Sequence, residues 1–131
     1  PDAGEPEKPL LILTSERVPR EYLSYLDGRN ISWIAAGKER IDLARAAEIL
    51  GAEFGVERMA VVGGSAINTS FLDAGLLDEV SILIGAGIDG RGGMPAVFDG
   101  LPKTHPVIPL RLTDVQKFYS GAVWMKYRIQ P

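Results

Sequence analysis

The chain has 131 residues, of which 46% are hydrophobic and 24% charged, and this composition is typical of one globular domain with one core. The formal charge is only −3 and the basic residues are scattered, which argues against a nucleic-acid partner. No apolar run reaches the roughly 20 residues of a membrane-spanning helix, and no signal-peptide pattern opens the chain, so we expect a soluble cytoplasmic protein. With no cysteine and one histidine, we expect no metal site.

The first residues differ in composition from the rest. Residues 1–8 are rich in proline and glutamate and predict a linker or surface loop, followed by a single domain within 1–131. Because the chain opens at Pro1 without a methionine, we expect further sequence upstream of it in the natural protein.

The first half alternates strands and helices. Residues 10–13 form a short apolar run, which predicts a strand buried on both faces, and a polar segment with Pro19 near its start predicts a helix. Residues 31–36 predict a second strand. A helix with apolar residues on one face follows, for which Asp42 is a suitable N-cap and Gly55 a suitable stop.

A strand, a tight turn and a helix are predicted next. The apolar run Met59–Val62 predicts a third strand, which breaks at Gly63-Gly64-Ser65. Residues 66–74 then predict a helix closed by Gly75.

The last part predicts an antiparallel closure of the domain. Residues 80–84 predict a fourth strand, and the glycines after it mark a long loop with unusual backbone angles at Gly92-Gly93. Alternating apolar residues between 108 and 129 predict two antiparallel strands that turn at Ser120-Gly121. The fold class is therefore α/β, with a mainly parallel sheet and an antiparallel hairpin at the end.

The turn at Gly63-Gly64-Ser65 is the first candidate site. Residues without Cβ atoms, placed between a strand and a helix, allow a ligand close to the backbone, and the first N–H groups of the helix suit an anion such as a diphosphate. Two adjacent glycines also make an ordinary tight turn, and the pair alone does not decide between these readings.

Two hydroxyl residues form the second candidate site. Thr14 and Ser15 follow the first strand, and ligands of parallel sheets gather at the carboxyl ends of strands, so these side chains suit a phosphate or a ribose. The same residue types also favour helix N-caps, and the two functions are compatible.

The titratable residues indicate no catalytic group. Asp78 and Glu79 are adjacent, so on a strand they point to opposite faces and we expect them to be structural. His105 lies in a polar, proline-containing loop and is expected to be solvated. The catalytic residues are therefore unknown from the sequence.

Two segments carry a resemblance to a known family. They are Val61-Val62-Gly63-Gly64-Ser65-Ala66-Ile67-Asn68 and Phe71-Leu72-Asp73-Ala74-Gly75-Leu76-Leu77-Asp78-Glu79. In this order they resemble the reductase domain of bacterial riboflavin-biosynthesis deaminase-reductases, and Leu11 to Ser15 and Ser32 to Ile34 are similar to strands of the more distant dihydrofolate reductases. The resemblance implies a dihydrofolate-reductase-like three-layer fold of which this chain lacks the N-terminal part.

The resemblance also implies NADPH as the cofactor. The diphosphate would lie on Gly63, Gly64, Ser65, Ala66, Ile67 and Asn68, the 2′-phosphate or ribose near Thr14 and Ser15, and the adenine near Ala36 and Gly37. Val62 stands where the riboflavin enzymes commonly carry a substrate-contacting glutamate, so it marks a substrate position while leaving the substrate open.

By the same resemblance the activity would be that of 5-amino-6-(5-phosphoribosylamino)uracil reductase, an NADPH-dependent oxidoreductase acting on a CH–OH group. The alternatives are a non-catalytic nucleotide-binding or oligomerising module of the same fold, and a dihydrofolate-reductase-like enzyme with another substrate. Relatives in the family are often dimers and residues 107–129 offer an apolar surface, so we expect a homodimer.

Overall fold

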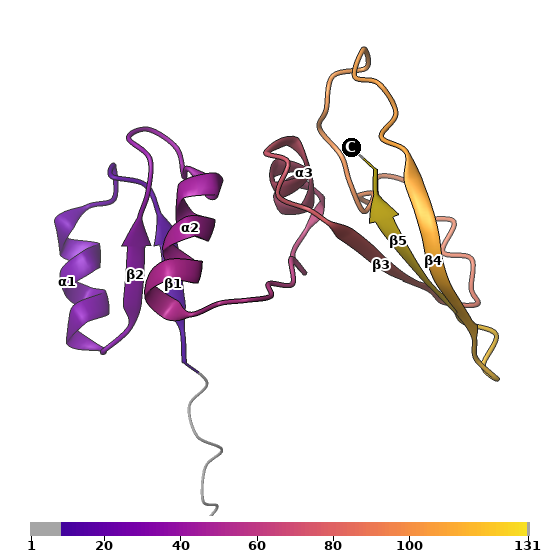
Figure 1. The fold of residues 1–131 in the computed structure, drawn as a ribbon, viewed down its shortest axis with the longest axis horizontal. Coiled ribbons are helices and arrows are strands. Elements are labelled where there is room, and N and C mark those ends of the chain that lie inside the picture. Colours follow the sequence, from indigo (N-terminus) through magenta and orange to yellow (C-terminus); the bar gives the residue numbers. More distant parts are fainter. Residues whose placement is uncertain (1–8, 131) are drawn as a thin grey trace, which may run out of the picture. The chain divides into compact units, whose positions relative to one another are not determined.

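The computed structural model describes residues 9–130, so the predicted linker at 1–8 lies outside the described residues. The chain divides into two compact units, Pro1–Met59 and Ala60–Pro131, whose described residues are treated one unit at a time below. In chain order the elements are β1 (Leu11–Thr14), α1 (Arg20–Gly28), β2 (Ser32–Ala35), α2 (Leu43–Phe54), α3 (Ser65–Asp73), β3 (Glu79–Ile84), β4 (Leu110–Lys117) and β5 (Val123–Ile129) (Figure 1). A single domain spanning 1–131 stays a prediction.

The first unit is a small α/β layer structure. Strands β1 and β2 pair in parallel, with Leu13 opposite Ile34, and α1 and α2 flank this pair on its two sides (Figure 1). Buried Ile34, Ala36 and Ala46 form the core on the α2 side. On the α1 side Leu26 is 2% exposed, which makes it the most completely buried large side chain among the described residues.

Local signals set the helix ends in the first unit. Helix α1 follows Pro19, as predicted, and α2 begins at Asp42, whose Oδ1 accepts a hydrogen bond of 2.9 Å from the Arg45 N–H. Helix α2 ends at Gly55, where φ is +66°, a left-handed conformation that glycine adopts without strain. The predicted N-cap and stop of α2 are both confirmed.

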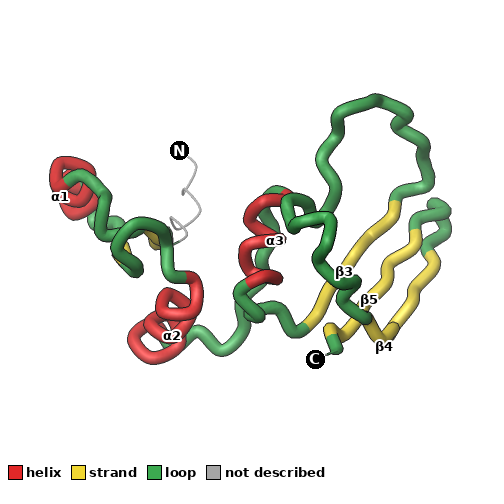
Figure 2. The backbone as a smooth tube through the Cα atoms, turned by 90° about the horizontal axis from the view of Figure 1, so that it is seen from above, coloured by secondary structure: helices red, strands yellow, loops and turns green. Residues whose placement is uncertain are grey.

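The second unit combines one helix with an antiparallel sheet. Helix α3 ends before Gly75, and the strand order of the sheet is β3-β5-β4 (Figure 2). Strands β4 and β5 join through a turn in which Gly121 has φ of +88°, as Ser120-Gly121 predicted. A bulge at Thr113 shifts the register between Leu112 and Asp114.

The structure differs from the sequence-based expectation at two points. The prediction of a strand at Met59–Val62 is wrong for this structure, because these residues pair with no described strand and an unpaired segment cannot complete the hydrogen bonds of a sheet. The α/β class is confirmed, but the only parallel pairing among the described residues is β1-β2, since β3 pairs antiparallel with β5. An apolar run does not reveal strand direction.

The helices of the described residues are all shorter or more polar than a membrane-spanning helix would be.

Candidate functional site

The amino end of α3 presents free backbone donors. The first hydrogen bond of the helix runs from the Asn68 N–H to the Gly64 carbonyl, at 3.1 Å, and no side chain caps this end. Helix geometry therefore leaves the N–H groups of Ser65, Ala66 and Ile67 without an acceptor in the helix. Together with the partial positive charge of a helix amino end, these donors suit an anionic group.

The glycines before α3 leave space beside the backbone. A Cβ atom added at Gly63 or Gly64 would have no neighbour within 4 Å, so the packing of the described residues does not demand glycine there. Gly64 has φ of +33°, a conformation that disfavours other residues, and the preceding Val62 is 91% exposed. The arrangement is therefore open to solvent at the point where the donors of α3 emerge.

Asn68 connects α3 to the glycine-rich loop. Its Nδ2 donates a hydrogen bond of 2.9 Å to the carbonyl of Val97, 29 residues further along the chain. Its Oδ1 is buried and accepts no hydrogen bond from the described residues. The side-chain amide of this predicted diphosphate residue is thus directed to the loop, and the sequence alone did not indicate this contact.

Thr69 provides a second connection to the same loop. It is 7% exposed, and its Oγ1 accepts a hydrogen bond of 2.8 Å from the Asp99 N–H. We expect Thr69→Val to cost about 1–2 kcal/mol of unfolding free energy, because the Asp99 N–H loses its acceptor in a partly buried setting. Hydrogen exchange of the Asp99 amide should accelerate in this variant.

Ser70→Ala is the matched control for Thr69→Val. The Ser70 hydroxyl donates to the Ala66 carbonyl within α3 and does not reach the loop, so its removal should leave Asp99 exchange unchanged. Equal exchange rates at Asp99 in all three proteins would contradict the assigned connection.

The loops after β1 and β2 meet in the first unit. The Ala36 N–H donates to the Thr14 carbonyl at 2.9 Å, and the Glu16 N–H donates to the Gly37 carbonyl at 2.8 Å. The structure therefore brings together Thr14, Ser15, Ala36 and Gly37, the four residues predicted to bind the ribose, phosphate and adenine. Ala36 is 3% exposed and its carbonyl accepts from the Asp42 N–H, so its own polar backbone groups are both occupied.

Gly37 has a structural requirement of its own. Its φ is +91°, and an added Cβ would lie 2.1 Å from the Arg40 carbonyl oxygen and 2.8 Å from the Asp42 nitrogen. Only glycine fits this position without displacing the backbone that leads into α2.

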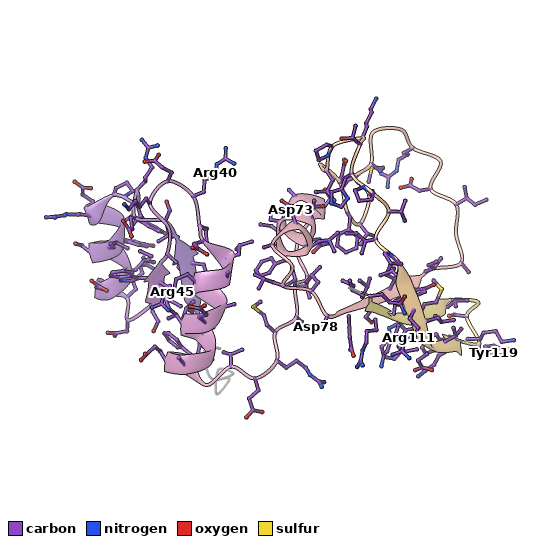
Figure 3. The ribbon with its side chains drawn as sticks, turned by 45° about the horizontal axis from the view of Figure 1, so that its top comes forward. Arg40, Arg45, Asp73, Asp78, Arg111 and Tyr119 are labelled. Atoms are coloured by element: carbon purple, nitrogen blue, oxygen red, sulfur yellow. The ribbon has the colours of Figure 1, made fainter. Side chains whose placement is uncertain are left out.

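A basic segment beside this cluster was not selected from the sequence. Lys38 and Arg40 are exposed in the loop that follows β2, and Arg40 extends away from the first unit in Figure 3. Neighbouring Glu39 is paired with Arg17 at 2.6 Å. The available signal was two cations within five residues after the carboxyl end of a parallel strand, and the scattered charge of the whole chain obscured it.

The remaining polar candidates have structural contacts. The Asp78 carbonyl accepts the Ile129 N–H at 2.9 Å, and Glu79 lies 3.4 Å from Arg128. His105 Nδ1 lies 2.7 Å from the Pro106 carbonyl. Among the described residues no three His, Cys, Asp or Glu side chains gather to hold a metal ion. In the glycine-rich loop, the Arg91 guanidinium hydrogen-bonded to Asp89 lowers the pKa of that carboxyl below its ordinary value.

The sequence comparisons agree with one another. The model of the RibD C-terminal domain matches residues 4–124 of the chain. The chain is 37% identical over 94 residues, 72% of its length, to 2,5-diamino-6-ribosylamino-4(3H)-pyrimidinone 5′-phosphate reductase of Methanothermobacter thermautotrophicus. It is 29% identical over 108 residues, 81% of its length, to the Aquifex aeolicus protein of the same name. These matches cover 43% and 48% of the two relatives, so the chain spans about half the length of either.

Solved structures show the same fold at lower sequence identity. A pyrimidine reductase-like protein from Corynebacterium diphtheriae matches 92% of this chain and 50% of its own, with a TM-score of 0.77 and 18% identity. RibD of Acinetobacter baumannii matches 92% of this chain and 37% of its own, with a TM-score of 0.73 and 15% identity. At these sequence identities, both matches show that the fold is shared and nothing about function.

Proposed function

The chain belongs to the RibD C-terminal domain family, and we propose that it is part of an NADPH-dependent reductase of riboflavin biosynthesis. The two relatives carry the name of a reductase of 2,5-diamino-6-ribosylamino-4(3H)-pyrimidinone 5′-phosphate, which makes this compound the first proposed substrate. Its deaminated counterpart, 5-amino-6-(5-phosphoribosylamino)uracil, is the second. The proposed location is the cytoplasm.

One observation carries the cofactor part of the proposal. The amino end of α3 has three backbone N–H groups without intrahelical acceptors, and the two glycines before it leave room for a ligand to approach. These features fit the diphosphate of a nicotinamide dinucleotide. The bound dinucleotide would supply a hydride to the ribose carbon of the substrate, and the chain would contribute binding and orientation.

The basic segment after β2 supports NADPH over NADH. The two cofactors differ by a 2′-phosphate, which favours a site with cationic side chains. Lys38 and Arg40 offer such charges beside Gly37, and Thr14 and Ser15 offer hydroxyl donors. We therefore propose that these residues contact the 2′-phosphate and ribose, with the adenine near Ala36 and Gly37.

Fluorescence titration of NADPH and NADH into the protein that contains this chain tests the proposal. We expect NADPH to bind at least about tenfold more tightly, and Arg40→Gln to weaken NADPH binding about tenfold without affecting NADH, because one charge contact to a phosphate contributes about 1.5 kcal/mol. Arg45→Gln is the control, since Arg45 lies on α2 and pairs with Glu48 at 2.9 Å (Figure 3). Absence of binding for both cofactors would favour a non-catalytic module of the same fold.

Val62 keeps the choice of substrate open. Its side chain is 91% exposed and cannot donate or accept a hydrogen bond. Turnover assays with the two pyrimidine substrates decide between them, and NADPH binding without turnover of either would indicate a reductase for another substrate.

A further inference from the structure

The second unit contains a cavity of about 300 Å³ at one end of its sheet. The sheet contributes Val80, Leu110 and Ile129 to the lining, which lie at adjoining ends of β3, β4 and β5. Helix α3 contributes Leu72, and the glycine-rich loop between β3 and β4 contributes the rest. The lining residues of the loop are Phe98, Leu101, Pro102, His105, Pro106 and Ile108. A cavity of this volume lies at the lower end of the range of small-molecule sites.

Two hydrogen bonds hold the loop side of the cavity against α3. The Asn68 Nδ2 donates to the Val97 carbonyl at 2.9 Å. The Asp99 N–H donates to the Thr69 Oγ1 at 2.8 Å. These bonds attach the loop to the helix on both sides of Phe98, whose side chain lines the cavity. A site that is formed before binding orders fewer groups when a ligand enters, so this cavity is suited to a ligand.

The lining of the cavity is apolar except for the side chain of His105. Water gains few hydrogen bonds against such a lining, so its displacement by an apolar molecule is favourable. The His105 Nδ1 lies 2.7 Å from the Pro106 carbonyl, which can only accept, and we therefore assign the hydrogen of this bond to Nδ1. The other ring nitrogen, Nε2, has no hydrogen-bond partner among the described residues, and in the neutral imidazole it is an acceptor.

We propose that this cavity is a binding site for a small planar aromatic molecule with one hydrogen-bond donor. The ring would pack against Phe98, Leu101 and Ile108, and its donor would bond to the His105 Nε2. A charged or strongly polar ligand is disfavoured, because apart from His105 the lining has no side chain that replaces the lost hydration. The phosphates and sugars of a dinucleotide therefore do not suit this cavity.

The cavity is separate from the proposed cofactor site. Leu72 lies near the carboxyl end of α3 (Ser65–Asp73), about 10 Å along the helix axis from Ser65. The free N–H groups proposed to bind the diphosphate are at the other end of this helix, so both sites can be occupied at once. Binding in the cavity requires no cofactor, and its test is therefore independent of the proposed reductase function.

Indole is a suitable probe for the cavity, because it is a small planar aromatic molecule with one N–H donor. We expect indole to bind the protein that contains this chain, without any cofactor, with a dissociation constant below about 1 mM. In NMR spectra, nuclear Overhauser effects should connect indole protons with the methyl groups of Leu72 and Ile108. Absence of binding, or contacts only with residues outside the lining, would overturn the proposal.

A substitution that fills the cavity provides a second test, with a matched control in the same loop. Leu101→Trp adds bulk to the lining and should weaken indole binding at least about tenfold. Val107→Trp introduces the same side chain at a residue that is 93% exposed and outside the lining, so indole affinity should stay unchanged. Equal indole affinities in the two variants would contradict the location. A loss of NADPH affinity in Leu101→Trp alone would contradict the separation of the two sites.

The hydrogen bond to His105 is tested by comparing indole with indene, which has the same ring shape and no N–H. The ratio of indole affinity to indene affinity should fall about fivefold from the wild type to His105→Phe, because only indole loses a neutral hydrogen bond. Phenylalanine keeps an aromatic ring at this position of the lining. An unchanged ratio would contradict the donor assigned to the ligand.

Discussion

Replacing Gly64 by aspartate is expected to weaken NADPH binding by about 100-fold. A carboxylate at the amino end of α3 would lie about 5 Å from the proposed diphosphate, and repulsion at that distance amounts to about 3 kcal/mol at an effective dielectric constant near 20. An added Cβ at this position meets no described atom within 4 Å, so a clash within the unit would not explain the loss, and the backbone strain that any side chain meets at this φ is shared by the control variant below. Titration of cofactor fluorescence measures the change directly.

Gly64→Asn is the matched control. Asparagine has nearly the shape of aspartate and suffers the same backbone strain at the φ of +33° and ψ of 156°, but it carries no charge. Both variants should therefore unfold at similar denaturant concentrations, while only the aspartate variant loses most of its affinity. Equal NADPH affinities in Gly64→Asp and Gly64→Asn would contradict the proposal that the diphosphate binds at the amino end of α3.

Local signals explain why most elements could be predicted from the sequence. Asp42 and Gly55 delimit α2, Gly75 follows α3, and Gly121 lies in the turn between β4 and β5, because each of these residues satisfies a need of the backbone at its own position. The prediction of a strand at Met59–Val62 was wrong because a strand depends on a distant partner and not on its own residues alone. Its apolar side chains favour a strand, but a strand exists only with a partner, and no local pattern specifies the partner.

The candidate site was predictable to the same degree. Gly64 follows from the junction before α3, and the hydroxyl residue Thr14 follows from the end of β1, which are both local features. The hydrogen bonds of Asn68 and Thr69 to the loop span 29 and 30 residues, so they could not be predicted from residue type or spacing. Arg40 was not selected from the sequence, because its position in the loop after the end of β2 is apparent only once the strand is placed.

The largest effect on stability is expected from Gly37→Ala. The new Cβ would lie 2.1 Å from the Arg40 carbonyl oxygen, and alanine disfavours a φ of +91°, so we expect a loss of about 3 kcal/mol or more of unfolding free energy. The disturbance should extend to two contacts, because the Gly37 carbonyl accepts the Glu16 N–H and Asp42 caps α2. Urea unfolding followed by circular dichroism measures the loss.

Gly51→Ala provides the comparison, with the same chemical change and the opposite expected sign. Gly51 lies inside α2, where an added Cβ has its nearest neighbour, the Val56 carbonyl oxygen, at 3.8 Å. Alanine should therefore raise the unfolding free energy by about 0.5–1 kcal/mol through its higher helix propensity. If Gly37→Ala kept the stability of the wild type and lost only cofactor affinity, Gly37 would be a ligand contact. A loss of stability without any cofactor present would instead show that Gly37 is needed to hold the loops after β1 and β2 together.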